Sequence, residues 1–99
     1  MTMTAAARLR DLCTGHGCWP PRPNDQGSPN VFVNGRASHR EGDHWETHCC
    51  PAIPECHDSH LAQGSETVFI NGREAGRVGD FVACGSLVAT GSPNVFIGG

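Results

Sequence analysis

The chain has 99 residues, enough for one domain with a thin core, and its formal net charge is −3. Seven arginines, no lysine and ten acidic residues have the wrong sign and are too dispersed to form a surface that follows phosphates, which excludes a nucleic-acid partner. No segment resembles a signal peptide or reaches the roughly 18 apolar residues that span a bilayer, so we expect synthesis in the cytoplasm and no stable membrane insertion.

The first segments of the chain are expected to be irregular. Residues 1–7 are small and polar, and we expect them to form a lead-in, as a frayed turn or short helix, to a single repeat domain over residues 8–99. Residues 11–23 contain a histidine and two cysteines separated by glycines, followed by three prolines. Because proline enforces an extended, non-helical path, this stretch is expected to be a loop.

A seven-residue box occurs three times and organises the chain. It is Gly-Ser-Pro-Asn-Val-Phe-Val from Gly27, Gly-Ser-Glu-Thr-Val-Phe-Ile from Gly64 and Gly-Ser-Pro-Asn-Val-Phe-Ile from Gly91. Each unit also carries an Arg-x-x-Asp motif, at Arg8–Asp11, Arg40–Asp43 and Arg77–Asp80. Three ordered copies of one unit predict a body with approximate threefold internal symmetry.

Each box predicts a short β-hairpin. Its β-branched and aromatic residues favour a strand, and the Asn-Gly pairs that follow the first two boxes, at residues 34–35 and 71–72, are typical of a type I′ turn. Alternation along the strands places the valines and isoleucines on one face and Phe32, Phe69 and Phe96 on the other. The third box lacks an Asn-Gly turn, so its strand is expected to pair elsewhere, beside an earlier unit, to close the ring.

The region between the first two boxes, residues 43–60, is the richest in histidine and cysteine. It has no sustained amphipathic period, so we expect a long ordered loop there, whereas residues 86–90 are expected to form a further short strand. The three Arg-x-x-Asp motifs are interpreted as turn-stabilising ion pairs. Trp19 and Trp45 are interpreted as packing lids over the loops rather than as binding platforms.

Superposition of the three units predicts a metal site. His16 and His48 each lie five residues after the aspartate of their motif, Cys84 lies four residues after its own, and His57 precedes its box by the same seven residues as Cys84. Equivalent positions of a threefold body meet near its axis. Three imidazoles and one thiolate complete the tetrahedral shell of zinc and leave no open position, so the predicted role of the ion is structural.

Several alternatives to this ligand set remain open. The histidines that could replace a ligand are His39, His44 and His60. Three roles are open for the remaining cysteines: buried small hydrophobic residues, disulfides formed after export, or metal ligands in place of Cys84. These cysteines are Cys13, Cys18, Cys49, Cys50 and Cys56. Because cytosolic thiols stay reduced, a metal is favoured over disulfides at the time of folding.

Three features of the sequence match one known family: the repeated boxes, the Arg-Val-Gly-Asp motif from Arg77, and the ending Thr-Gly-Ser-Pro-Asn-Val-Phe-Ile-Gly-Gly from Thr90. The sequence therefore resembles the PAAR-repeat family, the pointed tip proteins of type VI secretion spikes. The resemblance covers residues 8–99. Where the family has Pro-Ala-Ala-Arg, this chain has Ala-Ser-His-Arg at residues 37–40 and Glu-Ala-Gly-Arg at residues 74–77. The resemblance implies a small all-β cone made of three short hairpin repeats, with a zinc near its apex held by three histidines and one cysteine. The predicted set His16, His48, His57 and Cys84 fits that pattern.

The resemblance further implies a structural, non-enzymatic role. The flat base of the cone would cap and sharpen a trimeric VgrG spike, one tip per trimer, aiding membrane puncture and the delivery of secreted effectors. The protein would assemble in the cytoplasm and leave by type VI secretion into the target cell or medium, as a stand-alone tip. One alternative is an enzyme, either a zinc hydrolase or a cysteine nucleophile at Cys49 or Cys50, for which the short repeats leave little room. The other is a zinc- or disulfide-stabilised interaction module unrelated to secretion.

Overall fold

The two Asn-Gly sequences form hairpin turns in the computed structural model, which describes residues 3–99. Strand β2 (Phe32–Val33) pairs antiparallel with β3 (Arg36–Ala37), and β6 (Phe69–Ile70) pairs with β7 (Arg73–Glu74). The φ angles are 54° and 75° in the first turn and 54° and 76° in the second, positive as a type I′ turn requires. The hairpins predicted for the first two boxes are confirmed.

The third box closes the ring with the N-terminal segment. Strand β8 (Phe96–Ile97) pairs antiparallel with β1 (Thr4–Ala5). The expectation of a turn or helix in the lead-in is therefore wrong at β1, because this segment supplies the partner that the missing Asn-Gly turn denies to β8. Residues 1–2, which belong to the same expectation, lie outside the described residues.

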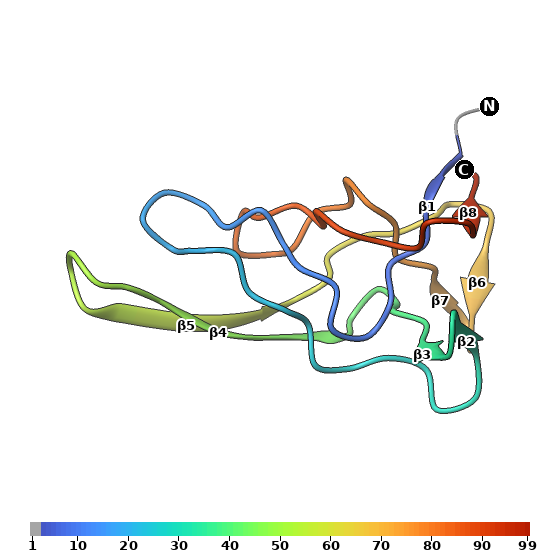
Figure 1. Ribbon diagram of the computed structural model, residues 1–99, viewed down its shortest axis with the longest axis horizontal. Helices are drawn as coiled ribbons and strands as arrows, with labels where there is room; N and C mark the ends of the chain where they lie inside the picture. The colour runs from blue at the N-terminus through green and yellow to red at the C-terminus, as the bar shows by residue number, and fades with distance from the viewer. Residues whose placement is uncertain (1–2) are drawn as a thin grey trace.

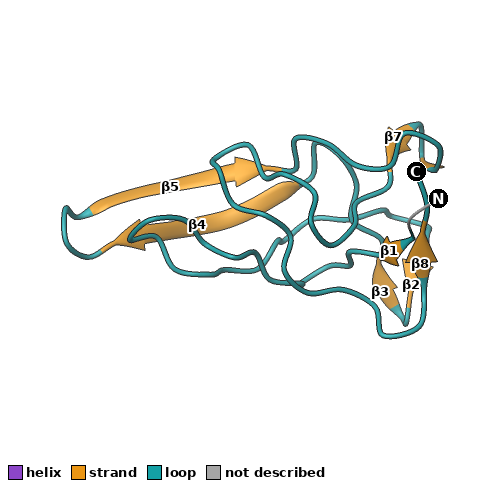
Figure 2. Ribbon diagram, turned by 90° about the horizontal axis from the view of Figure 1, so that it is seen from above, coloured by secondary structure: helices purple, strands orange, loops and turns teal. Residues whose placement is uncertain are grey.

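The longest strands form an arm that reaches the pointed end of the molecule. Strand β4 (His44–Cys50) pairs antiparallel with β5 (Glu55–His60), so the expectation of a long ordered loop over residues 43–60 is wrong. The register shifts between Trp45 and His48, and the buried side chains of β4 are therefore spaced by three residues and then by two. This irregularity hides the period of two that would have indicated a strand. Figures 1 and 2 show the arm extending away from the other hairpins.

Residues 86–90 do not form the predicted strand either. This segment takes part only in isolated bridges, which join Leu87 to Phe81 and Val88 to Cys13. The bridges fix it across the middle of the body, and no continuous ladder develops because its neighbours on either side are loops.

A ring of three backbone hydrogen bonds demonstrates the internal symmetry. The amide of Ala7 donates to the carbonyl of Gly76 over 2.9 Å, that of Gly76 to His39 over 2.8 Å, and that of His39 to Ala7 over 3.0 Å. Each of these residues directly precedes the arginine of an Arg-x-x-Asp motif. The three units therefore surround a common axis, as the repeats predict.

The Arg-x-x-Asp motifs form the expected ion pairs. In the second motif the guanidinium of Arg40 donates twice to Asp43, from Nε and from Nη2, both over 2.9 Å. The same carboxylate accepts the backbone amide of Arg40 over 2.9 Å, and the other two motifs repeat the arrangement. Each motif thus ties a side-chain pair to its own turn, which confirms the turn-stabilising interpretation.

Loss of one of these carboxylates is expected to be costly. Asp43 is fully buried and also pairs with Arg73 over 2.9 Å. Truncation in Asp43→Ala leaves Arg40 buried without its counter-charge, so we expect the free energy of unfolding to fall by about 3–5 kcal/mol. Urea unfolding measures the change. The control Glu66→Gln alters an exposed acid and should stay within about 0.5 kcal/mol of the parent; equal stability of both variants would refute the expectation.

Two apolar clusters lie one behind the other along the molecule, which measures 39 × 28 × 22 Å. The base cluster packs Val33, Ile70 and Ile97 around the axis together with two alanines, and Ala6 is one of them. The body cluster lies nearer the point and consists of Ala7, Cys13, Trp45, Leu61, Val82 and Val88. Part of the lead-in segment is thus packed into both cores.

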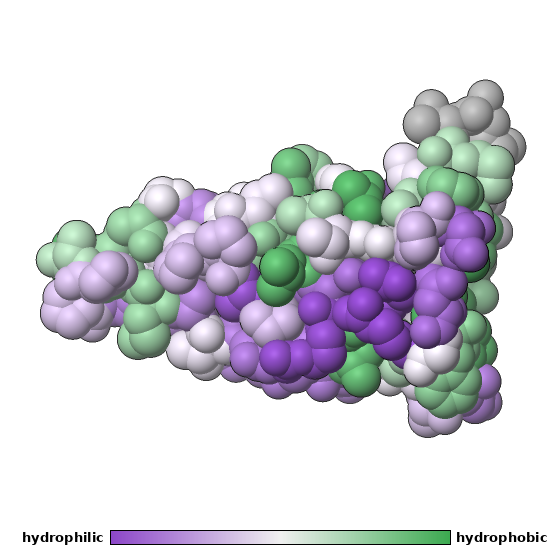
Figure 3. Space-filling model, viewed as in Figure 1, coloured by the Kyte–Doolittle hydropathy of each residue, from purple (hydrophilic) through white to green (hydrophobic). Residues whose placement is uncertain are grey.

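The opposite faces of the box strands are turned outward, as alternation predicts. Phe32 is 60% exposed, Phe69 57% and Phe96 51%. Figure 3 shows apolar residues gathered along the broad end of the molecule. The broad end is therefore a base with three equivalent aromatic side chains in solvent. Within residues 3–99, the structure contains no helix with the length and apolarity to cross a membrane.

Candidate metal centre

Three separate segments bring the four predicted ligands together on the pointed side of the body cluster. His48 lies on β4 and His57 on β5, whereas His16 belongs to the loop before Trp19 and Cys84 to a tight turn at residues 82–86. The imidazole nitrogens and the sulfur of the four all lie within 4.8 Å of one another. Such a cluster of three nitrogens and one sulfur is a group that could hold a metal ion.

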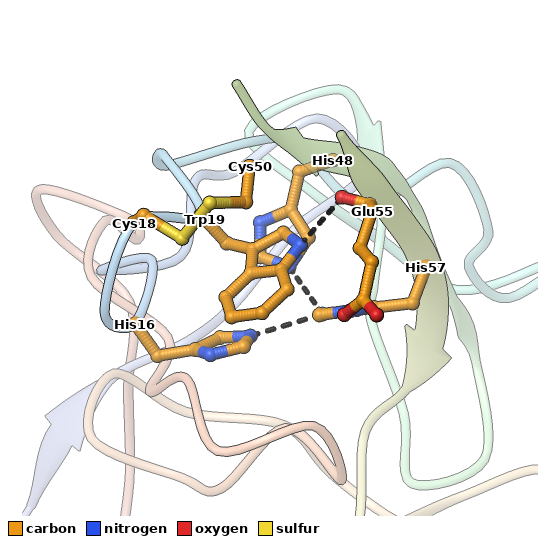
Figure 4. Close-up of a disulfide and its surroundings, with 7 residues drawn as sticks. All are labelled: His16, Cys18, Trp19, His48, Cys50, Glu55 and His57. Carbon is orange, nitrogen blue, oxygen red and sulfur yellow. Dashed lines mark hydrogen bonds between the residues drawn. A yellow bond between two sulfur atoms is a disulfide. The ribbon is translucent and has the colours of Figure 1, made fainter. Parts of the chain in front are cut away.

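The three imidazoles face one another through their Nε2 atoms. His48 and His57 are directly opposite in the β4–β5 register, and their Nε2 atoms are 2.7 Å apart. The Nε2 atom of His16 approaches that of His57 to 3.0 Å from the other side (Figure 4). The hairpin arm therefore supplies two of the nitrogens and the loop supplies the third.

A hydrogen bond fixes the orientation of His48. Its Nδ1 lies 2.8 Å from the carbonyl oxygen of Pro20, and because a carbonyl can only accept, Nδ1 carries the proton. The lone pair of neutral His48 is then on Nε2, the atom that faces the other histidines. Metal-binding histidines commonly have such a carbonyl partner on their second nitrogen.

The environment favours the metal-binding forms of these groups. Burial lowers the pKa of His16, as do the neighbouring charges of His57 and Arg22. Burial likewise lowers the pKa of His48 and outweighs the hydrogen bond to Pro20, which acts in the opposite direction. For the Cys84 thiol, burial raises the pKa, but hydrogen bonds from Ser86 and Arg22 outweigh it, so the pKa is lowered. Neutral imidazole and thiolate are the forms that coordinate metals.

Two disulfides tie the histidine-bearing segments to one another. Cys18–Cys50 joins the loop of His16 to β4, and Cys49–Cys56 joins β4 to β5. Of the alternatives left open for these four cysteines, the structure therefore takes the disulfides. Cys13 is free and buried, the small hydrophobe among the alternatives, and Cys84 is also free. Because Cys49 and Cys50 alternate along β4, their bridges lie on opposite faces of the strand.

Trp19 covers the histidine cluster. Its ring stacks on His16 with centroids 5.1 Å apart, and its centroid is 5.0 Å from that of His57. The indole Nε1 donates to the carbonyl oxygen of Glu55 over 3.0 Å, which anchors the ring on the arm. Trp19 is thus the packing lid that was expected. The same expectation is wrong for Trp45, which is fully buried in the body cluster.

The sequence matches the model of a known family. The model of the PAAR motif matches residues 14–90, more than three quarters of the chain. The chain belongs to the PAAR-motif family. Proteins of this family are structural spike-tip components of type VI secretion systems rather than enzymes. A comparison with curated protein sequences finds no match.

The remaining histidines of this PAAR-motif protein lie outside the cluster. His39 is fully buried with Nδ1 2.8 Å from the carbonyl oxygen of Gln26, and His60 is exposed. His44 is held between two carboxylates, with Asp25 at 2.6 Å from Nδ1 and Asp58 at 2.8 Å from Nε2. Among the described residues, these three histidines do not join the group of four.

His44 should make the stability of this PAAR-motif protein depend on pH. Hydrogen bonds to Asp58 and Asp25 raise its pKa above the ordinary value of about 6.5. The stabilisation is then complete below that value and is lost as the pH rises through the raised pKa. We expect the melting temperature to fall over this window in the parent and the fall to be smaller in His44→Gln. Identical pH profiles of the two proteins would contradict this role.

Proposed function

We propose that this protein is the tip of a type VI secretion spike and that its base caps a trimeric VgrG protein, one tip per trimer. The observation that carries the proposal is the base itself, where three equivalent strand pairs surround one axis and each presents an exposed phenylalanine. A partner with threefold symmetry can meet such a base so that each protomer contacts one unit. The family match over residues 14–90 supports the same role. The proposal treats residues 8–99 as one PAAR-repeat domain.

The chemistry of the base favours a protein partner. Besides the three phenylalanines, the valines before them, Val31, Val68 and Val95, are each more than a third exposed. Exposed apolar side chains that gather at one end of a molecule commonly mark an interaction site. The short strands β2, β6 and β8 are each paired on one side only, so their other edges are available for strand addition by the spike.

The same proposal assigns one structural zinc to His16, His48, His57 and Cys84. Three imidazoles and a thiolate suit zinc in ligand type and number, and no ligand position is left for a substrate. The ion would tie the loop, the arm and the turn to one another close to the point of the cone. We infer that the bound ion keeps the tip from fraying when the spike is driven into a membrane. In this proposal the tip assembles on the spike in the cytoplasm, and the spike then carries effectors with it.

The test is the stoichiometry of the complex. Purified protein is mixed with a purified VgrG trimer, and the mass of the complex is measured by light scattering after size-exclusion chromatography. One chain per trimer is the expected result. No complex would favour the alternative of an interaction module unrelated to secretion, and three chains per trimer would contradict capping along the axis.

A further inference from the structure

Arg22 differs from every other arginine among residues 3–99. The other six each have a carboxylate within 4.0 Å, whereas the guanidinium of Arg22 has none. Arg22 is nevertheless only 5% exposed. A buried charge without a counter-charge is costly, so the groups that Arg22 does contact require explanation.

The contacts of Arg22 are directed at the two free cysteines. Nη1 lies 3.0 Å from the Sγ of Cys13, and Nη2 lies 3.5 Å from the Sγ of Cys84. Nε donates to the carbonyl oxygen of Glu46 over 2.6 Å, and the guanidinium lies over the ring of Trp45, 5.5 Å from its centroid. The backbone of β4 and the core tryptophan thus hold the guanidinium in place, and its two arms reach one sulfur each.

The two sulfurs that Arg22 contacts are also the two that form no disulfide. Four of the six cysteines form disulfides, and the two that remain free are Cys13 and Cys84. Both belong to the same packed region, since Cys84 packs against the body cluster that contains Cys13. The guanidinium group is rigid and planar, so a sulfur that accepts a hydrogen bond from it is held in a fixed position. One lone pair of that sulfur is then engaged in the hydrogen bond.

We propose that Arg22 is a positioning residue of the metal centre, which holds Cys13 and Cys84 on separate arms of its guanidinium so that Cys84 stays available as a metal ligand. The inference rests on the zinc site proposed above. A cysteine that binds a metal does so as the thiolate, so Cys84 would be negatively charged at the site. Nη2 of Arg22 is placed to donate a hydrogen bond to that sulfur. Without the guanidinium, Cys13 becomes a competitor for Cys84.

The competing reaction is thiol–disulfide exchange with an oxidant such as glutathione disulfide. One cysteine thiolate attacks glutathione disulfide, forms a mixed disulfide and releases one glutathione thiolate. The second cysteine then displaces the other glutathione, which forms the Cys13–Cys84 bond. The two sulfurs lose two electrons, glutathione disulfide gains them, and the protons pass to solvent. The metal loses its only sulfur ligand in the process.

The test treats the zinc-loaded protein with glutathione disulfide and follows free thiols and bound zinc together. The parent should keep two free thiols and its zinc, as should the control Arg10→Met, which removes an exposed arginine paired with Glu46. Arg22→Met should lose both thiols and the zinc, and the double variant with Cys13→Ser should keep the zinc. This rescue distinguishes positioning from a merely structural role, because a folding defect would persist in the double variant.

Arg22→Lys provides a second reading if Arg22→Met does not fold. A single ammonium cannot hold both sulfurs, so this variant should also lose thiols and zinc together, though more slowly than Arg22→Met. Retention of both thiols and zinc in the Arg22 variants overturns the proposal, as does loss of zinc despite Cys13→Ser. If the parent itself binds no zinc, the metal site of the proposed function fails and this inference fails with it. If the parent binds zinc and the Arg22 variants keep their thiols and zinc as the parent does, this inference alone fails.

Discussion

Removal of both the metal and the disulfides is expected to unfold the pointed half of the protein, whereas removal of either one alone leaves it folded. The segments of His16, His48 and His57 are tied once by the two disulfides and, in our account, a second time by the metal. Structural zinc contributes roughly 10–16 kcal/mol of apparent free energy in small domains that are unfolded without it. Because the two disulfides already hold the metal-binding segments of this protein together, we expect a smaller contribution here. Disulfides that span 32 and 7 residues contribute about 4 and about 2–3 kcal/mol by loop-closure entropy.

Thermal unfolding followed by circular dichroism in four states measures this redundancy: native, chelated, reduced, and both chelated and reduced. We expect a modest fall of the melting temperature in the two single treatments and a far larger fall in the last. His60→Ala, which changes an exposed histidine outside the cluster, should behave like the parent in all four. A chelated and reduced protein that melts at the native temperature would show that neither staple stabilises the fold.

Replacement of the three base phenylalanines by serine is expected to abolish capping of the spike trimer while leaving the protein folded. Phe32, Phe69 and Phe96 are all more than half exposed, so their loss costs the monomer little. Aromatic side chains at the centre of an interface typically contribute about 2 kcal/mol or more each. Single variants should therefore weaken binding roughly 30-fold or more, and the triple variant should show no complex.

Phe81→Ser is the matched control for the base variants. Phe81 is 53% exposed, similar to the base phenylalanines, but it lies in the bridged segment near Leu87 rather than in a box. It should bind the trimer like the parent protein. Full-strength binding by the triple variant would place the interface elsewhere, and equal loss of binding in Phe81→Ser would indicate a general effect of the substitution.

The repeats made much of this fold predictable from sequence. The Asn-Gly turns and the alternation of valine and phenylalanine fixed the hairpins and the exposed face, because both signals are local. Registration of the three units placed His16, His48, His57 and Cys84 at equivalent positions, and the structure brings these four side chains together. Symmetry thus carried information that no single histidine contains.

Features that occur in only one unit could not be predicted in this way. The β4–β5 arm was missed because the irregularity between Trp45 and His48 breaks the alternation of its buried residues. The disulfide pairing could not be deduced because five other cysteines compete for each partner. Arg22 gave no signal, since its role depends on two sulfurs that lie 9 and 62 residues away along the chain.

Metal analysis of the purified protein and its ligand variants shows whether the four side chains hold one ion. We expect about one equivalent of zinc per chain in the parent and in His60→Ala, and a loss of that metal in His16→Ala, His48→Ala, His57→Ala and Cys84→Ala. A parent protein that takes up no zinc, or four variants that each retain a full equivalent, would contradict the claim that these side chains hold one ion.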